Sequence, residues 1–377
     1  NPLEPVLDGT NGFATPQDVL DAATAKRGDG PVNAIDPNFE IPSQYRWNLG
    51  ISHTLPYDIQ MTADVIYSRV NDEVLWQDLR LNQVGTAPDG RPIYAQSADG
   101  RSSSTQDLLL TNTSEGESTI WTVDFSKTWR TGAGRFDAFL GYGHQDVTEV
   151  NPGTSSTASS NWDNVATSAP NAPGLTTSNY QIEHRFTTSL AWRKAFFGDY
   201  ETSVGLYGER RSGRPYSLTF GSGSPVWGDP RQGSRQRQLF YVPDGDVIFE
   251  VACGAGDVGV VAGCGATTDF TSASPAAARF ASDMDAFIQQ NGLEKYRGRI
   301  APRNSQRSPW VSVFDLRVAQ ELPIFKRSRG IVTFDIENLA NFINSDWGQL
   351  RQVGFPYVAP IVDANRIATT HRIVRPK

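Results

Sequence analysis

The amino-acid sequence predicts an all-β chain whose long antiparallel strands form part of a transmembrane β-barrel. Three observations lead to this fold class. Apolar and polar residues alternate with a period of two. The connections between the alternating segments are alternately short and very long. The segments reach or exceed the roughly 9–11 residues that a tilted strand needs to cross a bilayer, whereas globular strands average about 5–6 residues.

The composition fits this class and excludes two others. The chain has 377 residues, of which 38% are hydrophobic and 20% are charged, as expected for strands that are apolar on one face only. A helical membrane protein is excluded because no apolar run approaches the roughly 18 residues of a transmembrane helix. The net charge of −7 argues against a nucleic-acid partner, which would require a basic face.

The first predicted hairpin joins the segments 45–55 and 59–68 across a tight turn at 56–58. Only His53 interrupts the apolar side of the first segment, which consists of Tyr45, Trp47, Leu49, Ile51 and Leu55. The second segment has the apolar side Ile59, Met61, Ala63, Val65 and Tyr67. Because successive side chains of a strand point to opposite faces, each strand has one apolar and one polar side.

Three further hairpins repeat this pattern. Their turns lie at 130–134, at Gly198-Asp199 and, somewhat longer, at 323–330. The apolar residues that alternate with polar ones are Trp121, Val123, Phe125, Trp129, Phe136, Ala138, Leu140, Tyr142, Phe186, Leu190, Trp192, Val204, Leu206, Trp310, Phe314, Leu316, Val318, Val332, Phe334 and Ile336. The total is eight clear strands, and the segment 367–374 is considered as a ninth.

The connections between hairpins predict the orientation of the barrel. Short turns alternate with long segments at 77–116, 146–177 and 217–307, and outer-membrane barrels have short periplasmic turns and long extracellular loops. We therefore expect an outer-membrane location in a Gram-negative cell, with 1–44 and 217–307 as extracellular loops. Two aromatic girdles are expected, with Trp129, Phe136 and Trp192 near the periplasmic rim and Trp47, Trp121 and Trp310 near the outer rim.

The polar side of the strands predicts which residues face the lumen of the barrel. The charged candidates are Asp64, Asp124, Asp137, Arg185, Arg193, Asp315, Arg317, Asp335 and Glu337. Such groups either contact other parts of a receptor and line a transport path, or are simply solvated in the lumen.

The longest loop contains two further features. Its cysteines, Cys253 and Cys264, are spaced so that a disulfide could close a small loop, with two unrelated thiols as the alternative. The segment 275–292 predicts a short helix, since Phe280, Met284, Phe287 and Ile288 fall on one face. We expect this helix to pack loop residues together, and a lid over the barrel mouth is the alternative.

The sequence contains no catalytic constellation, so neither an enzyme nor a cofactor is expected. The histidines His53, His144, His184 and His371 are far apart in the sequence and have no metal-ligand spacing. The acidic pairs Asp244/Asp246 and Asp283/Asp285 lack the spacing of an EF-hand calcium loop and are expected to be solvated charges.

Several short motifs go beyond the fold class. They are DPNFEIP at 36–42 with WNLG at 47–50, LEKYRG at 293–298 with RN at 303–304, PW at 309–310 and DLR at 315–317, and ENLANFIN at 337–344 with WG at 347–348. Together they resemble the barrel of TonB-dependent outer-membrane receptors of the OmpA-related (Oar-like) group. The resemblance extends over most of 36–348 and implies a 22-stranded barrel that is closed by an N-terminal plug.

The resemblance implies that residues 1–377 are a C-terminal portion of such a barrel, with eight or nine of its strands and without the plug. The implied activity is the energised uptake of a nutrient. The implied partners are outer-membrane lipid, the rest of the same receptor, and the TonB complex through the N-terminal part that this chain lacks. Two other functions remain open, a passive porin and a surface adhesion or binding protein built as a β-sandwich.

Overall fold

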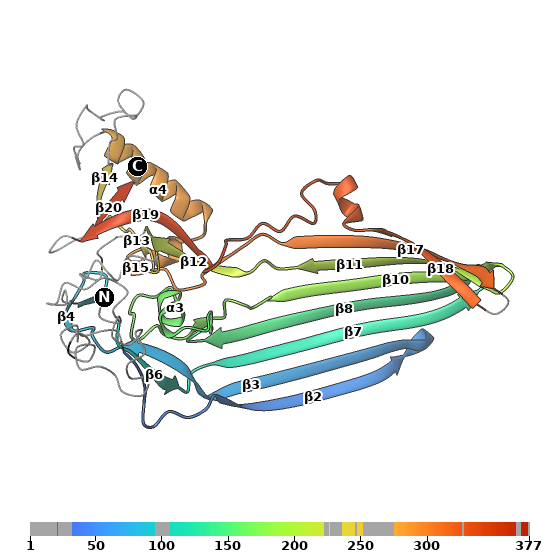
Figure 1. The fold of residues 1–377 in the computed structure, drawn as a ribbon. Helices are drawn as coiled ribbons and strands as arrows, with labels where there is room; N and C mark the ends of the chain where they lie inside the picture. The colour runs from blue at the N-terminus through green and yellow to red at the C-terminus, as the bar shows by residue number, and fades with distance from the viewer. Residues whose placement is uncertain are drawn as a thin grey trace, which may run out of the picture.

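The computed structural model describes Asp21 and residues 32–94, 106–221, 226, 236–245, 247–251, 275–325, 328–366 and 371–375. Within these ranges the chain consists mainly of β-strands (Figure 1). Two parts are visible in Figure 1, a sheet of long strands and a group of shorter elements at one end of that sheet. We refer to the second part as the cap. No helix in the described ranges has both the length and the apolar character needed to cross a membrane.

The long strands form one antiparallel sheet in which neighbours in space are neighbours in the predicted order. The strands are β2 (Ser43–Leu55), β3 (Ile59–Asp78), β7 (Glu117–Thr131), β8 (Gly134–Glu149), β10 (His184–Phe197), β11 (Tyr200–Arg211), β17 (Val311–Phe325) and β18 (Ser328–Ile336). The short strands β1 (Asn33–Ile35), β6 (Leu108–Thr113) and β9 (Thr176–Thr177) extend it at the cap end. The predicted fold class, a partial antiparallel barrel of eight strands with long loops, is confirmed.

The ninth strand considered for 367–374 is not part of this sheet. Its described portion is β20 (His371–Arg375), which pairs with β14 (Ile248–Val251) and β19 (Val358–Arg366) in a smaller sheet of the cap. The sequence pattern of a short strand does not state its partner, so alternation alone assigned this segment to the wrong sheet.

The turns at the far end of the sheet are tight, as predicted. The first is a single 3-10 turn, η1 (Pro56–Asp58), and the second joins Thr131 to Gly134. Gly134 has φ 128°, and a Cβ atom at this position would lie 2.5 Å from the carbonyl oxygen of Arg193. Glycine is therefore required here, both for its backbone conformation and for the close approach of β10.

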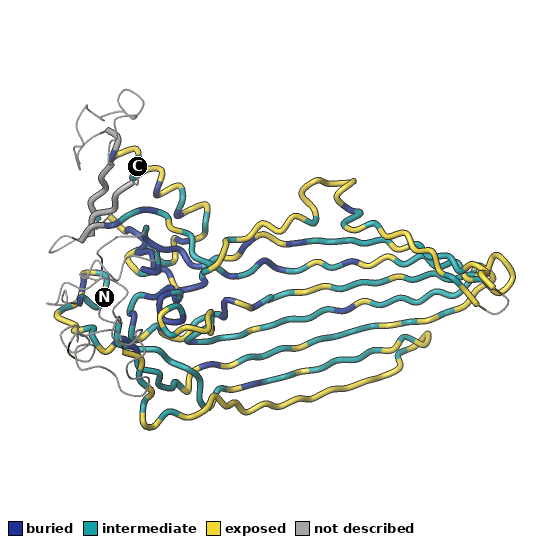
Figure 2. The backbone as a smooth tube through the Cα atoms, viewed as in Figure 1, coloured by how far each residue is buried: buried dark blue, intermediate teal, exposed yellow. Residues whose placement is uncertain are grey.

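The strand register gathers the apolar sides of all eight strands on one face of the sheet, which we call the apolar face. One row of directly opposed residues runs Leu49, Val65, Trp121, His144, His184. The residues of this face are exposed or half-buried, and exposure is high on the two edge strands, with 76% of Leu49 and 64% of Phe334 accessible. The long strands in Figure 2 accordingly contain few buried positions.

The hydrophobic core lies in the cap, where the buried segments of Figure 2 gather. The cap elements not yet named are β4 (Gln83–Thr86), β5 (Pro92–Tyr94), α3 (Ala158–Asp163), β12 (Pro215–Phe220), β13 (Tyr241–Val242), α4 (Pro275–Gln290), η3 (Glu294–Tyr296), β15 (Arg299–Ile300) and β16 (Gln306–Arg307). Phe220, Phe240, Val242, Ile288 and Leu293 are fully buried in this core. The long connections expected as loops therefore have a folded structure of their own.

The helix predicted for 275–292 is α4, which ends at Gln290. Phe280, Met284 and Ile288 are 8%, 3% and 0% exposed and belong to the cap core. The expectation that this helix packs loop residues together is confirmed. The possible disulfide between Cys253 and Cys264 lies outside the described residues and stays a prediction.

Hydrogen bonds between different long connections join them into one cap. The Arg91 side chain donates to the carbonyl oxygen of Leu239 at 2.9 Å, and the Leu239 N–H donates to the carbonyl oxygen of Thr167 at 3.2 Å. Asn171 accepts the N–H of Asp78, at the end of β3, at 2.8 Å. Because these residues come from three separate connections, the cap is held by contacts that no single loop could make alone.

The motif Arg303-Asn304 links the cap to the ends of the long strands. The Thr176 hydroxyl donates to the Arg303 carbonyl oxygen at 2.7 Å, and the Asn304 amide donates to the Thr177 carbonyl oxygen at 2.7 Å. The guanidinium of Arg303 donates to the Glu149 carbonyl oxygen at 2.8 Å, and burial lowers the pKa of Arg303 to about 10. The buried Arg303 side chain thus binds backbone carbonyl oxygens where the cap joins the long strands.

Candidate functional site

The charged residues predicted to face a lumen lie together on the face opposite the apolar one, which we call the polar face. One row of this face runs Gly50, Asp64, Thr122, Gly143, Arg185. By the same register the face also carries Asp124, Asp137, Arg193, Asp315, Arg317 and Asp335, and Glu337 directly follows the last residue of β18. The structure thus brings the predicted charged residues together on one side of the sheet. That this side faces the lumen of a barrel stays a prediction.

A groove of about 410 Å³ lies on the strands β10, β11, β17 and β18. Small residues form its floor on the polar side, namely Ser189, Ala191 and Gly205. Tyr207 and four of the predicted residues also line it, the latter being Asp315, Arg317, Asp335 and Glu337. The groove forms because small residues on two central strands are flanked by long charged side chains on the next two.

The charges in the groove are unequal in number. Arg317 forms a bidentate ion pair with Asp335, with Nε–Oδ1 and Nη2–Oδ2 distances of 2.6 and 3.2 Å. Asp315 accepts the backbone N–H of Asn338 at 2.8 Å, which fixes the chain as it leaves β18. With three carboxylates to one guanidinium, the groove carries net negative charge, which attracts cations and repels anions.

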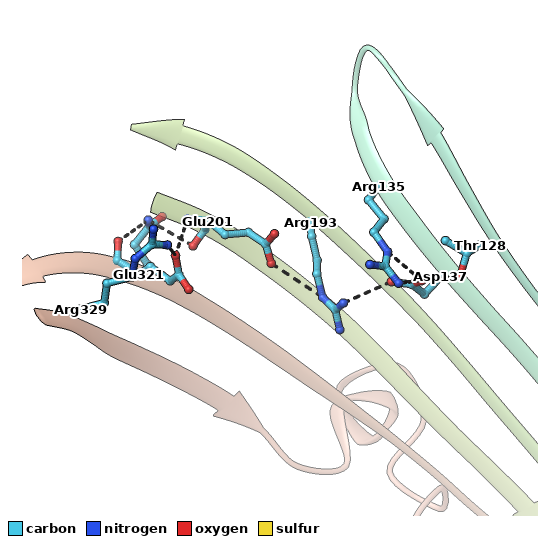
Figure 3. Close-up of polar contacts among 8 residues, drawn as sticks. Thr128, Arg135, Asp137, Arg193, Glu201, Glu321 and Arg329 are labelled. Atoms are coloured by element: carbon cyan, nitrogen blue, oxygen red, sulfur yellow. Dashed lines mark hydrogen bonds and ion pairs between the residues drawn. The ribbon is translucent and has the colours of Figure 1, made fainter. Parts of the chain in front are cut away.

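A second set of polar contacts crosses the polar face near the tight turns, and we call it the charge ladder (Figure 3). Asp137 accepts from Thr128 at 2.6 Å and pairs with Arg135 at 2.9 Å. Arg193 lies between the two acids Asp137 and Glu201, at 3.4 and 3.8 Å. The Arg135–Asp137 pair lies within β8, and the other three contacts join adjacent strands, so the ladder crosses from β7 to β11.

The ladder continues through a third acid to the last strand of the sheet. Glu321 on β17 accepts the backbone N–H of Glu201 at 3.0 Å and pairs with Arg329 of β18 at 2.8 Å (Figure 3). The sequence prediction included Asp137 and Arg193 but not Arg135, Glu201, Glu321 or Arg329. Arg135 lies two residues from Asp137 on the same strand, whereas the contacts of Glu201, Glu321 and Arg329 are found only when the register states which side chains face each other.

Replacing Arg193 by methionine should lower the free energy of unfolding by less than about 1 kcal/mol, because the side chain is 41% exposed and water screens both of its ion pairs. The measurement is urea-induced unfolding of the chain in detergent micelles. Arg351→Met serves as the control, since Arg351 forms an exposed pair with Asp346 at 2.6 Å. A loss above about 2 kcal/mol for Arg193→Met alone would mean that the ladder acts as one cooperative network.

On the apolar face, the predicted aromatic groups lie at opposite ends of the strands. At the cap end Trp121 stacks edge-on with Tyr142 at 5.0 Å, and Phe186 contacts Trp310 at 6.4 Å. At the turn end Trp129 stacks on Phe136 with ring centres 5.3 Å apart. The rows between these two ends contain aliphatic residues such as Leu140 and Leu190, together with Phe125 and Phe314.

Cations on the apolar face occur at the same two ends and contact aromatic rings. At the turn end, Lys127 lies 5.9 Å from the ring centre of Tyr57 and Lys194 lies 5.4 Å from that of Phe196. At the cap end, the Arg210 guanidinium lies 5.4 Å from the ring centre of Trp310. The long aliphatic stems of these cations cover apolar surface while their charged ends reach outward.

Two of the histidines that are distant in the sequence are adjacent in the structure. His144 on β8 is directly opposite His184 on β10, and their Nδ1 atoms are 3.4 Å apart. Separation in the sequence therefore does not mean separation in space for this pair, because β8 and β10 are neighbours across a long connection. The described residues hold no group of three or more His, Cys, Asp or Glu side chains that could bind a metal.

The acidic pairs in the cap fit the expectation of solvated charge where they are described. Asp285 is exposed and pairs with Arg297 at 3.0 Å. The partner of Asp244, Asp246, lies outside the described residues.

Comparisons with known proteins return one structural likeness. No known protein-family description matches the chain, and no curated protein matches it. Among solved structures, the outer membrane transporter YddB from Escherichia coli is similar, with a TM-score of 0.42 and 7% sequence identity. The likeness covers 83% of this chain and 31% of that transporter, so the chain spans about a third of its length.

Proposed function

We propose that this chain is the membrane-embedded portion of an outer-membrane transport barrel, with its apolar face in lipid and its polar face toward a lumen. The observation that carries the proposal is the exposed apolar face itself. It extends over eight strands and includes Leu49 at 76%, Ile51 at 60% and Phe334 at 64% exposure. Soluble monomers rarely leave a contiguous apolar surface of this size in water.

The width of the apolar face supports a bilayer as its environment. On β10 the outermost polar groups of this face are His184 and Lys194, ten residues apart, or about 33 Å along a strand. An outer-membrane barrel has an apolar band about 25 Å tall, and a strand tilted by about 40° needs about 33 Å to cross it. The two aromatic ends then coincide with the two membrane interfaces, where amphipathic rings are most favourable.

The open edges of the sheet support the proposal that further strands of the same receptor complete the barrel. Among the described residues, β2 pairs only with β3, and β18 pairs only with β17. Unpaired backbone N–H and C=O groups are very costly in lipid, so both edges require partners. The proposed partners are the remaining barrel strands and the plug, together with outer-membrane lipid.

The finer function that we propose is energised uptake of a nutrient, with the TonB complex acting through the N-terminal part of the receptor. Its support is the resemblance of the motifs at 36–50, 293–317 and 337–348 to Oar-like receptors. The polar groove and the charge ladder fit a surface that contacts a plug or a polar solute. The role is transport rather than catalysis, and no nucleic acid takes part.

The first experiment tests membrane insertion. The complete receptor is refolded into phospholipid vesicles that contain brominated acyl chains, and its tryptophan fluorescence is compared with that of a Trp121→Phe/Trp310→Phe variant. We expect quenching, because Trp121 and Trp310 are 37% and 44% exposed on or beside the apolar face. A chain that stays monomeric in buffer without detergent, and is not quenched, would instead be a surface β-sandwich for adhesion or binding.

The second experiment separates energised uptake from passive conductance. Ion conductance by the purified chain alone in planar bilayers would favour a porin. Solute uptake by cells that express the complete receptor, lost when the TonB complex is deleted, would support the energised mechanism.

A further inference from the structure

The histidine pair on β8 and β10 has the geometry of a metal site, although the proposed transport function does not use it. The pair lies at the cap end of the apolar face, at the root of the connection between these two strands. The Nδ1 atoms of His144 and His184 point toward each other at 3.4 Å. This separation is longer than the roughly 2.7–3.2 Å of a good hydrogen bond between nitrogen and its acceptor.

The same separation matches two ligands of one metal ion. Zinc binds imidazole nitrogen at about 2.0–2.1 Å, so two nitrogens at a tetrahedral angle lie about 3.3–3.4 Å apart. An ion between His144 and His184 would therefore reach both Nδ1 atoms with little movement of either ring. The strand register holds the two residues directly opposite each other, which fixes this approach.

A possible third ligand, an oxygen atom, and a nearby carboxylate lie beside the two histidines. The hydroxyl of Tyr142, two residues before His144 on the same face of β8, lies 2.9 Å from His184 Nδ1. On the far side of the His184 ring, Nε2 lies 3.9 Å from the carboxylate of Glu183, which Arg307 holds at 2.9 Å. At 3.9 Å this contact is too long for a hydrogen bond, so Glu183 contributes negative charge near the pair rather than a fixed ring orientation.

We propose that His144 and His184 bind a divalent transition-metal ion of the zinc or copper class through their Nδ1 atoms. The Tyr142 oxygen lies beside the ion, and water completes the coordination, because the His184 side chain is 35% exposed. The ion joins β8 to β10 where the connection 150–183 leaves the sheet. Strand register alone forms the site, so it does not depend on the proposed transport function.

The test is titration of the full chain, refolded in detergent micelles, with Zn²⁺ by calorimetry and with Cu²⁺ by tryptophan fluorescence. We expect one ion per chain and partial quenching by Cu²⁺, because the rings of Trp121 and Trp310 lie 5.5 and 5.9 Å from His144 and His184. His144→Gln and His184→Gln should each weaken binding by at least about tenfold, because each variant removes one of the two nitrogen ligands. The matched control is His53→Gln, which removes a histidine from the same face near the turn end.

Two outcomes would overturn the site. One is the absence of Zn²⁺ and Cu²⁺ binding by the folded chain, and the other is equal affinity of the wild type and the His144→Gln/His184→Gln double variant. Circular dichroism and resistance to heat in detergent establish that each variant is folded before titration. Because binding is measured in micelles, its failure is distinct from a failure of vesicle insertion, which is scored in lipid without added metal.

Discussion

Replacing Leu190 by arginine should destabilise the sheet in a bilayer by about 2–4 kcal/mol, the cost of a cation at the mid-plane of the lipid face of a barrel. Leu190 lies near the middle of the apolar side of β10 and is 45% exposed. The same substitution at an exposed site in water changes stability by less than about 0.5 kcal/mol. The effect therefore depends on whether lipid or water covers this face.

The neighbouring residue supplies the control. Ser189 precedes Leu190 on β10, and its side chain points to the polar face, where it lines the groove of about 410 Å³. Ser189→Arg should insert and fold nearly as well as the wild type. The measurement is urea-induced unfolding from vesicles, followed by tryptophan fluorescence. Equal losses for the two variants, or none for Leu190→Arg, would contradict the assignment of the apolar face to lipid.

Replacing Phe220 by alanine should destabilise the cap by about 3–5 kcal/mol while the long strands keep their structure. Phe220 is fully buried, its ring centre lies 5.5 Å from that of Phe240, and the Arg91 guanidinium lies 5.5 Å from its face. Truncation leaves a cavity in the cap core and removes the ring that covers the buried cation. The two parts respond differently because the hydrophobic core lies in the cap.

Limited proteolysis measures this effect. Trypsin should cleave the variant rapidly between residues 212 and 310, while circular dichroism continues to report the long strands. Phe342→Ala is the matched control, because Phe342 is 85% exposed and has no core contacts to lose. If Phe220→Ala unfolded the sheet and the cap together, the cap would be an integral part of the barrel rather than a separately stabilised unit.

The alternation of side chains was sufficient to predict the eight long strands, because the period of two reflects the pleat of each strand independently of its partners. The short turns and the helix α4 were predicted for the same reason, since turn residues and helical periodicity are local properties. The resulting parity was also sufficient to choose the set of polar-face residues, from Asp64 to Asp335. Each of these inferences requires only neighbours within one segment.

Other features depend on which segments meet. The pairing of β20 with β14, the contact of His144 with His184, and the partners of Arg193 in the charge ladder all join residues far apart in the chain. The cap core likewise forms from two long connections, 77–116 and 217–307, and the C-terminal segment. In short segments with few apolar residues the hydrophobic periodicity is weak, so their sequences do not predict that these segments pack together.

The sequence by itself determined that this chain makes long strands with one apolar and one polar side, because that pattern must match the pleat and the two environments of every strand. Only the tertiary structure decided which charges face each other and where the core lies. It also brought the two histidines to metal-binding distance. Cross-strand register sets those distances, and register is a property of paired strands rather than of any one of them.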